Sequence, residues 1–563
     1  MITRDQSSDS RPQSALDDRA DAYVRGLAKL DPIAATEWGV TEETGDLPDF
    51  SPAGYAALDD LSRTLLRDLD TLPLVDETDA VTAAALRETL EAELALADAG
   101  EGLSDLNNIA SPLQQIRDSF DLMSRDTESD WDVIAHRLDL VPAALAGHRE
   151  SLGAAAAEGR VAALRQVGLV AQQARALCSA DGALTGLAAE AVDSDTATEA
   201  IRRQLAQGLE SARPACEAFA DFLERELAPF APADDAVGRE RYARFSRSFV
   251  GATIDLDETY EWGLQELAAI DAEQHAIVRD LYGDGVSVRE GLDRLNADPE
   301  LQLHGTDALR EWMQGLADGA IADLDGTHFD IPAPAHTIEC MVTESGDGGI
   351  YYTGPSADWS RPGRMWWAVP PGEDTFHTWQ ERTTVFHEGV PGHHLQVSQA
   401  VFEADSLNLW RRFASWNSGH GEGWALYAEG LMAELGFQDD PRNRMGMLDG
   451  MRLRAARVCL DIGVHLGKPR PDGQGTWDAD YAWEFLKDNV AMADGFLRFE
   501  LDRYLGWPGQ APSYKVGMRL WQQLRADWLA ANPGKGLKEF HTRALSLGGL
   551  PMATLRSALL PHS

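Results

Sequence analysis

Helix-forming segments follow one another from Leu16 to about Gly326, and no serine- and glycine-rich linker interrupts the chain. They are rich in Ala, Leu, Arg and Glu, and apolar residues recur at the spacing that buries one helix face. Clear examples span 52–72, 79–99, 130–157 and 256–281. No repeat of fixed period is present. The pattern predicts a mainly α fold in which one large helical body surrounds a central cleft.

The composition changes near residue 328, where Gly, Pro, Trp and Tyr replace the helix formers. Within 328–370, short apolar and aromatic runs predict strands at 338–342, 349–353 and 365–369. Helical patterns resume at Thr375 and continue to the end of the chain. We therefore expect disorder over 1–15, a helical region over 16–327, and a region over 328–563 that begins with the small sheet.

Composition also limits the partners. The 92 acidic and 49 basic residues give a net charge of −43, which disfavours nucleic acid and anionic membrane surfaces. No apolar run approaches the roughly 20 residues of a membrane span, and the polar start lacks a signal-peptide pattern, so we expect a cytoplasmic protein. The four cysteines are scattered singly, which favours buried thiols over a thiolate metal site. The sequence does not indicate the oligomeric state.

The sequence His387-Glu388-Gly389-Val390-Pro391-Gly392-His393-His394 departs from the H-E-x-x-H pattern of zinc peptidases. In that pattern two histidines four residues apart share a helix face and one metal ion. Here the second histidine is six residues on, which a regular helix turns roughly 120° away. Pro391 cannot continue the helix and Gly392 is conformationally free. The helix should therefore break there and return a histidine to the metal.

Two choices of ligand remain open. His393 keeps the glycine-histidine order of the standard pattern and is preferred as the second ligand over His394, which would then face substrate or support the site. Glu422 and Glu429 are seven residues apart and share a helix face. We expect Glu422 to complete a site with His387 and His393, and Glu429 to orient a ligand imidazole, although the two could exchange roles.

Further residues are candidates for catalysis or substrate binding. Glu388 would act as the general base on water. Tyr514, or alternatively His465, could donate a hydrogen bond to the developing oxyanion. Gln396 could hydrogen-bond near the site, and Arg457 could bind a substrate carboxylate. Tyr351 lies on a predicted strand whose edge could pair with an extended peptide, although aromatic packing is the favoured role for it.

At these residues the sequence resembles a bacterial family known as domain of unknown function 885. Its members carry H-E-x-x-P-G-H-H-x-Q and then E-G-W-A-x-Y-x-E, which are present here at 387–396 and 422–429. Further matches lie at 360–363, 508–517 and 548–551, and the resemblance is strongest from about 340 to 555. The glutamate spacing is also similar to that of thimet and carboxypeptidase Taq oligopeptidases. Dipeptidyl peptidase III offers a parallel for a widened histidine pair.

The resemblance implies a helical zinc metallopeptidase with one ion, which makes 328–563 the catalytic region. We expect a hydrolase that cleaves a peptide or related amide bond in a small substrate. One alternative is a metal-dependent lyase or amidohydrolase that acts on a non-peptide metabolite. A non-catalytic binding protein with a degenerate site is disfavoured, because a structural metal site has no use for a base such as Glu388.

Overall fold

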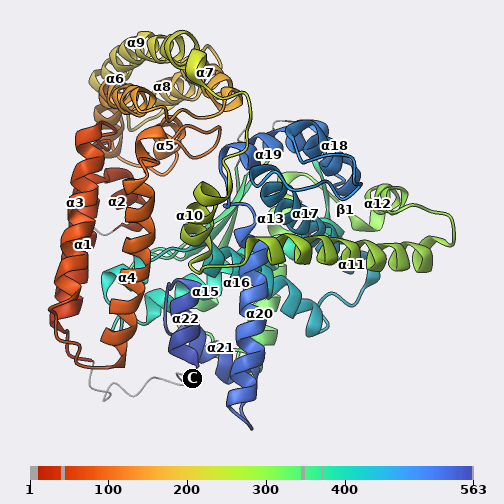
Figure 1. The fold of residues 1–563 in the computed structure, drawn as a ribbon. Coiled ribbons are helices and arrows are strands. Elements are labelled where there is room, and N and C mark those ends of the chain that lie inside the picture. The colour runs from red at the N-terminus through yellow and green to blue at the C-terminus, as the bar shows by residue number, and fades with distance from the viewer. Residues whose placement is uncertain (1–10, 40–44, 344–348, 371, 561–563) are drawn as a thin grey trace.

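Long helices build the first half of the chain (Figure 1). The computed structural model describes residues 11–39, 45–343, 349–370 and 372–560. Helices α1, α3 and α4 run side by side, and α5–α9 form a bundle at one end of them. The bounds are α1 Ala15–Leu30, α2 Pro32–Trp38, α3 Pro52–Leu69, α4 Glu77–Asp98, α5 Pro112–Ser119, α6 Glu128–Ala157, α7 Leu164–Leu177, α8 Ala183–Asp193 and α9 Glu199–Phe222.

Helices α10–α13 lead into the second half. Their bounds are α10 Arg239–Val250, α11 Leu256–Tyr282, α12 Val288–Asn296 and α13 Thr306–Leu324. The second half continues with α14 Thr378–Glu388, α15 His393–Phe402, α16 Ser418–Glu434, α17 Pro441–His465, α18 Ala479–Asn489, α19 Asp494–Gly506, α20 Ser513–Ala531, α21 Leu537–Leu545 and α22 Met552–Leu559. Helix α11 packs along α17, and α16 packs along α20. The predicted mainly α fold is confirmed.

The predicted small sheet is also present. Strands β2 (Ile338–Thr343), β4 (Gly363–Ala368) and β3 (Ile350–Thr353) lie in that order, with β2 parallel and β3 antiparallel to β4. A second pair, β1 (Gln302–His304) with β5 (Thr375–His377), was not predicted. These strands have three residues each, too few to show an alternating pattern in the sequence.

The buried hydrophobic residues form two large clusters, and the larger one extends across residue 327. Helices α1, α3 and α4 share one buried cluster with α10, α11, α13 and the second half, whereas α5–α9 bury a cluster of their own. Apolar periodicity shows which face of a helix is buried but not what covers it. One buried cluster therefore contains residues from both sides of residue 327.

Residues 11–15, which were expected to be disordered, are ordered in the structure. Ser14 caps α1, and its hydroxyl accepts a hydrogen bond from the Asp17 amide. Arg11 forms ion pairs with Asp17, Asp76 and Asp79 that tie the start of α1 to the start of α4. These partners are distant in sequence, so composition alone did not reveal the contact. Residues 1–10 lie outside the described part of the chain.

Among the described residues, no helix is long and apolar enough to span a bilayer.

Candidate metal centre

The chain breaks between α14 and α15 at the place where the sequence predicts it. Helix α14 ends at Glu388 and α15 begins at His393, and the Val390–Pro391 peptide bond between them is cis. The Gly392 amide bonds to the Phe386 carbonyl at 3.1 Å. A Cβ atom at Gly392 would lie 1.9 Å from the His387 carbonyl oxygen, so only glycine fits this tight turn. Trp424 holds the turn from α16 by donating to the Pro391 carbonyl at 2.8 Å.

The break brings three predicted ligands together. The Nε2 atoms of His387 and His393 lie 3.4 Å and 3.5 Å from the same carboxylate oxygen of Glu422. The two imidazole rings are nearly perpendicular, with centroids 4.9 Å apart. Both histidines are buried, and Glu422 comes from the first turns of α16. Three potential ligand atoms therefore converge from three different helices.

Glu429 fixes the orientation of His387. Its carboxylate accepts a hydrogen bond from Nδ1 of His387 at 2.8 Å and another from the Thr383 hydroxyl at 2.5 Å. The Nε2 atom of His387 is thereby left to face Glu422. Burial disfavours a charged imidazole, but Glu422 and Glu429 outweigh it and raise the pKa of His387 to about 10. Against the effect of burial, His387 and His393 keep the pKa of Glu422 below its usual range.

Glu388 lies beside the two histidines, and potential ligand atoms of the three residues are within 4.8 Å of one another. Its side chain is buried, and its Oε2 atom has no hydrogen-bond partner in the described structure. Burial raises the pKa of Glu388, although the neighbouring histidines act in the opposite direction. A buried carboxylate oxygen without a partner is costly unless a ligand or water satisfies it.

The donor set and its spacing fit zinc. In a tetrahedral site with bonds of about 2.0–2.1 Å, neighbouring ligand atoms lie roughly 3.3–3.5 Å apart. The distances of 3.4 Å and 3.5 Å from Glu422 to the two histidines match that requirement. Two imidazoles and one carboxylate leave a fourth position for water or substrate, as catalytic zinc sites do. The Glu429–His387 hydrogen bond is the support that ligand histidines ordinarily receive.

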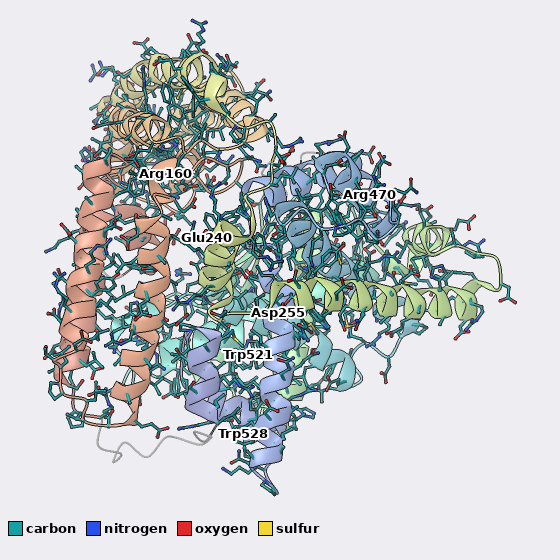
Figure 2. All side chains as sticks on the ribbon, in the orientation of Figure 1. Arg160, Glu240, Asp255, Arg470, Trp521 and Trp528 are labelled. Atoms are coloured by element: carbon teal, nitrogen blue, oxygen red, sulfur yellow. The ribbon has the colours of Figure 1, made fainter. Side chains whose placement is uncertain are left out.

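Small residues let α20 approach the cluster. A Cβ atom at Gly423 would lie 2.5 Å from the Gly517 backbone, so α16 and α20 are in direct backbone contact. Farther along, Trp521 of α20 packs against Trp424 with ring centroids 5.0 Å apart, and Trp528 follows toward the helix end (Figure 2). This packing fixes the first turn of α20, which carries Tyr514.

Tyr514 joins the cluster to a group of charged residues. Burial raises its pKa, and the negative charge of Glu422 adds to the effect. Its ring lies 5.3 Å from the Arg457 guanidinium carbon. Glu500 forms ion pairs with Arg457 at 2.6 Å and with Arg503 at 3.1 Å. Two guanidinium groups thus share one carboxylate, which leaves this buried group with an excess positive charge.

The structure separates His394 from the three converging ligand atoms. Its Nε2 donates to the Ala335 carbonyl at 2.9 Å, and its Nδ1 accepts from the Tyr352 hydroxyl at 2.9 Å. Both ring nitrogens are therefore engaged, one by Tyr352 of β3 and the other by Ala335 in the turn before β2. Burial lowers the pKa of His394 to about 4. Gln396, one turn along α15, points instead toward His420, with its amide nitrogen 3.3 Å from Nδ1 of that residue.

His465 and Tyr351 contact residues outside the histidine–glutamate cluster. His465 ends α17, where its Nε2 donates to the Tyr504 carbonyl at 2.9 Å and burial lowers its pKa to about 4. Asp461, four residues before His465 on the same helix, accepts hydrogen bonds from the Tyr242 hydroxyl and the Gly509 amide instead. A helical offset of four residues permits such a contact but does not require it. Tyr351 is 45% exposed and stacks on Trp366 of the neighbouring strand.

Trp416 lies beside His393, but the sequence motifs did not predict it as part of the site. Its ring lies 6.0 Å from that of His393, yet the side chain is 57% exposed. A Cβ atom at Gly421 would meet the Trp416 ring at 2.3 Å, so the indole rests on the first turn of α16. An exposed tryptophan beside buried histidines offers a flat apolar surface to a substrate. In the sequence, the feature that could have indicated Trp416 is its position shortly before the proposed ligand Glu422.

The fold and this cluster define a mainly helical protein with a buried histidine–glutamate centre. A model of the family described as bacterial protein of unknown function (DUF885) matches residues 32–559, and the chain belongs to that family. No curated protein matches the chain.

Two solved structures are similar over nearly the whole chain. A protein from Colwellia psychrerythraea, provisionally named a lipoprotein, is 22% identical with a TM-score of 0.83, over 97% of this chain and 98% of that chain. A provisionally named lipoprotein of unknown function from Shewanella oneidensis is 16% identical with a TM-score of 0.73, over 97% and 100%. These similarities concern the fold.

Proposed function

We propose that this protein is a zinc-dependent hydrolase that cleaves a peptide or a related amide bond. The observation that carries the proposal is the spacing of His387, His393 and Glu422, whose ligand atoms suit one tetrahedral ion. The buried, unsatisfied carboxylate of Glu388 beside them supports a catalytic rather than a structural site. A zinc ion held there supplies Lewis acidity, which lowers the pKa of water and polarises a carbonyl group.

Each nearby side chain then has a role in amide hydrolysis. Glu388 takes a proton from the attacking water and transfers it to the leaving nitrogen. The Tyr514 hydroxyl donates a hydrogen bond to the substrate oxygen on which negative charge develops. Glu429 keeps Nε2 of His387 directed at the centre. Trp416 lies at the exposed side, where it would pack against an apolar part of the substrate.

The charged group next to Tyr514 supports a substrate that carries a carboxylate. Among the described residues, Glu500 is the one carboxylate in an ion pair with Arg457 and Arg503, so an incoming carboxylate would balance the remaining positive charge. Arginine suits this role because its planar group can bind a carboxylate through two hydrogen bonds. We therefore expect short peptides with a free C-terminal carboxylate to be better substrates than the same peptides with an amidated end.

The test is cleavage of a peptide library by the wild type and by Glu388→Gln, with zinc content measured for both. We expect the wild type to bind about one zinc ion and cleave peptides, and Glu388→Gln to keep the metal but lose at least a hundredfold in kcat. Glu434→Gln, a surface change on α16 where Glu434 pairs with Arg525, is the matched control and should behave as wild type.

Two results would contradict the proposal. Absence of bound metal in the wild type removes its basis, and full activity of Glu388→Gln removes the proposed base. If the wild type binds zinc but cleaves no peptide, a screen of small metabolites with mass spectrometry of the products tests the lyase and amidohydrolase alternatives. Products of such a reaction would replace peptide hydrolysis as the function.

A further inference from the structure

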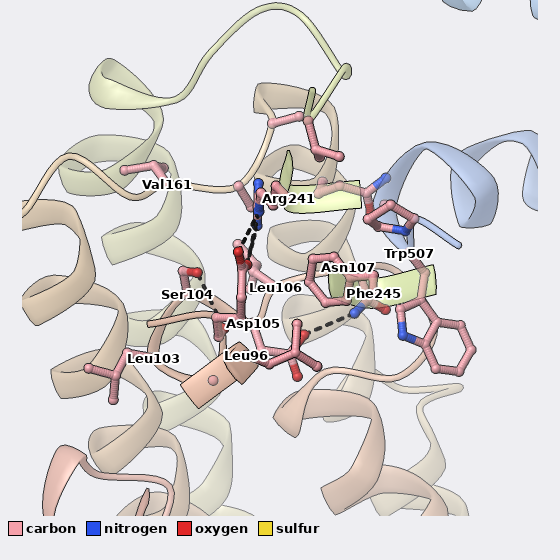
Figure 3. A pocket seen from close by; sticks show the side chains of 18 of the residues that line it. Leu96, Leu103, Ser104, Asp105, Leu106, Asn107, Val161, Arg241, Phe245 and Trp507 are labelled. Atoms are coloured by element: carbon pink, nitrogen blue, oxygen red, sulfur yellow. Dashed lines mark hydrogen bonds and ion pairs between the residues drawn. The ribbon is translucent and has the colours of Figure 1, made fainter. Parts of the chain in front are cut away.

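The structure contains a cavity of about 480 Å³ outside the metal centre. Figure 3 shows side chains that line it. It is lined by residues of α3, α4 and the loop that follows α4, by the start of α7, by α10 with the loop before it, and by the end of α19. His387, His393 and Glu422 are not among the residues that line it. Its volume is within the usual range for small-molecule sites.

Much of the cavity wall is apolar. Leu96, Leu106, Val161, Phe245 and Trp507 are among the apolar residues that line it. Trp507 is fixed by an edge-on contact with Phe249 of α10, with ring centroids 5.5 Å apart. A ligand with a hydrocarbon or aromatic body would therefore gain from burial in this cavity.

The residues that line the cavity carry more negative than positive charge. Arg241 is the one lysine or arginine that lines it, against the carboxylates of Asp59, Glu93, Glu101, Asp105, Asp234 and Asp235. Arg241 is already paired with Glu101, whose two oxygens lie 2.9 Å from its Nε atom (dashed lines in Figure 3). Asp235 is paired with Arg165 at 3.2 Å, from outside the lining.

Glu93 and Asp105 form no ion pair with a described residue, although the charge of Arg241 acts on Asp105 from a distance. Within the described residues, Glu93 has no hydrogen bond or ion pair, and Asp105 accepts one hydrogen bond, from the Asn107 amide at 3.1 Å. Glu93 is exposed and Asp105 is half-buried. Desolvation by the surrounding protein raises the pKa of each to about 7, although Asn107 and Arg241 act in the opposite direction on Asp105. A cation in the cavity would interact favourably with the charged form of both carboxyl groups and would lower the pKa of each.

We propose that this cavity binds a small organic cation, with an ammonium or guanidinium group directed at Glu93 and Asp105 and an apolar body against Phe245 and Trp507. The cation supplies the positive charge that the two carboxylates lack, and the apolar walls hold the rest of the molecule. The free amine of a metabolite and the amino terminus of a short peptide share this chemistry. The inference does not depend on the proposed hydrolase activity.

The test is calorimetric titration of the full-length protein at pH 7.5 with 4-phenylbutylamine, 4-phenylbutanol and 4-phenylbutyrate. We expect the amine to bind at one site, the alcohol at least tenfold more weakly, and the carboxylate not at all. Phenylalanyl-leucine amide, added in a separate titration, shows whether a peptide amino terminus is also accepted. Equal affinity for the amine and the alcohol, or no binding of the amine at millimolar concentration, would overturn the proposal.

Substitutions locate the binding. Glu93→Gln and Asp105→Asn should each weaken amine binding at least tenfold, without lowering the melting temperature of the ligand-free protein. Glu91→Gln changes the same charge on α4 at a position outside the cavity, and should bind as wild type. Ala56→Trp, which fills the cavity from α3 without altering a charge, should abolish binding. Wild-type affinity in Glu93→Gln, Asp105→Asn and Ala56→Trp would show that the amine binds elsewhere.

Discussion

Glu429 accepts a hydrogen bond of 2.8 Å from Nδ1 of His387, and this contact directs the opposite nitrogen of the ring toward Glu422. The two glutamates of α16 therefore act on the same histidine in different ways. Glu422 shares the centre with its Nε2, while Glu429 lies behind the ring and sets its tautomer. The seven-residue spacing of the two glutamates produces this arrangement, because it places them on one face two turns apart.

Replacement of Glu429 by Gln should weaken zinc binding without removing any of the three proposed ligands. The loss of the buried carboxylate leaves the imidazole less basic and less firmly oriented, and we expect a 10- to 100-fold lower zinc affinity. Competition with a chromophoric chelator measures it. Glu434→Gln on the same helix is the control for loss of one charge, and equal zinc affinity of Glu429→Gln and this control would contradict the role assigned to Glu429.

Gly392→Ala should disrupt the turn that returns His393 to the centre. Its Cβ would lie 1.9 Å from the His387 carbonyl oxygen, a backbone atom of the helix that carries the first ligand. We expect a loss of about 1–3 kcal/mol or more in the free energy of unfolding, together with loss of zinc binding. Urea unfolding and metal analysis measure both effects.

A control for that change is Gly153→Ala in α6, where an added Cβ meets nothing within 4 Å. Alanine is the better helix former, so this variant should gain roughly 0.5–1 kcal/mol. If Gly392→Ala were as stable as Gly153→Ala and still bound zinc, the tight turn would not be a requirement of the site.

The helical fold and the break at Pro391-Gly392 could be predicted because both follow from local chemistry. Apolar periodicity indicates helices directly, and a proline four residues after His387 cannot continue the helix. The three strands of the sheet were also indicated by short aromatic runs. In each case the residues that carry the information lie within a few positions of the structure that they determine.

Contacts between distant segments could not be predicted in this way. Arg11 forms ion pairs with Asp76 and Asp79 at the start of α4. Asp461 accepts a hydrogen bond from the Tyr242 hydroxyl and not from the nearby His465. The cavity near Glu93 depends on how α4 and α10 pack, which no local pattern encodes. Local patterns therefore predict elements and motifs, whereas ion pairs and cavities depend on the tertiary packing.

Tyr514→Phe should lower kcat while zinc content and the fold stay unchanged. The substitution removes only the hydroxyl, which we expect to hydrogen-bond to the oxygen of the reacting amide as its charge develops. Loss of one such donor lowers kcat by about 10²- to 10³-fold. Steady-state kinetics on a cleaved peptide test this, and His465→Gln is the comparison, because the structure places His465 against the Tyr504 carbonyl. A normal kcat for Tyr514→Phe with a strongly reduced one for His465→Gln would reverse the assignment.

The ion pair of Glu500 with Arg457 should make stability depend on pH in the acid range. Burial acts against the charged carboxylate, but Arg457 and Arg503 outweigh it and lower the pKa of Glu500 to about 2. Because the pKa is lower in the folded protein than in the unfolded chain, the contribution is complete above about pH 4.5 and is lost as the pH falls toward 2.

The shift corresponds to about 3 kcal/mol, as an order of magnitude for a nearly fully buried group. Urea unfolding of the wild type and of Glu500→Gln, at several pH values from 7 down to 2.5, isolates this carboxylate from the many others that titrate in the same range. We expect the difference in unfolding free energy between the two proteins to be constant from pH 7 to about 5 and then to shrink steadily. A difference that stays constant down to pH 2.5 would mean that Glu500 keeps an ordinary pKa, and that the two arginines do not stabilise its charge.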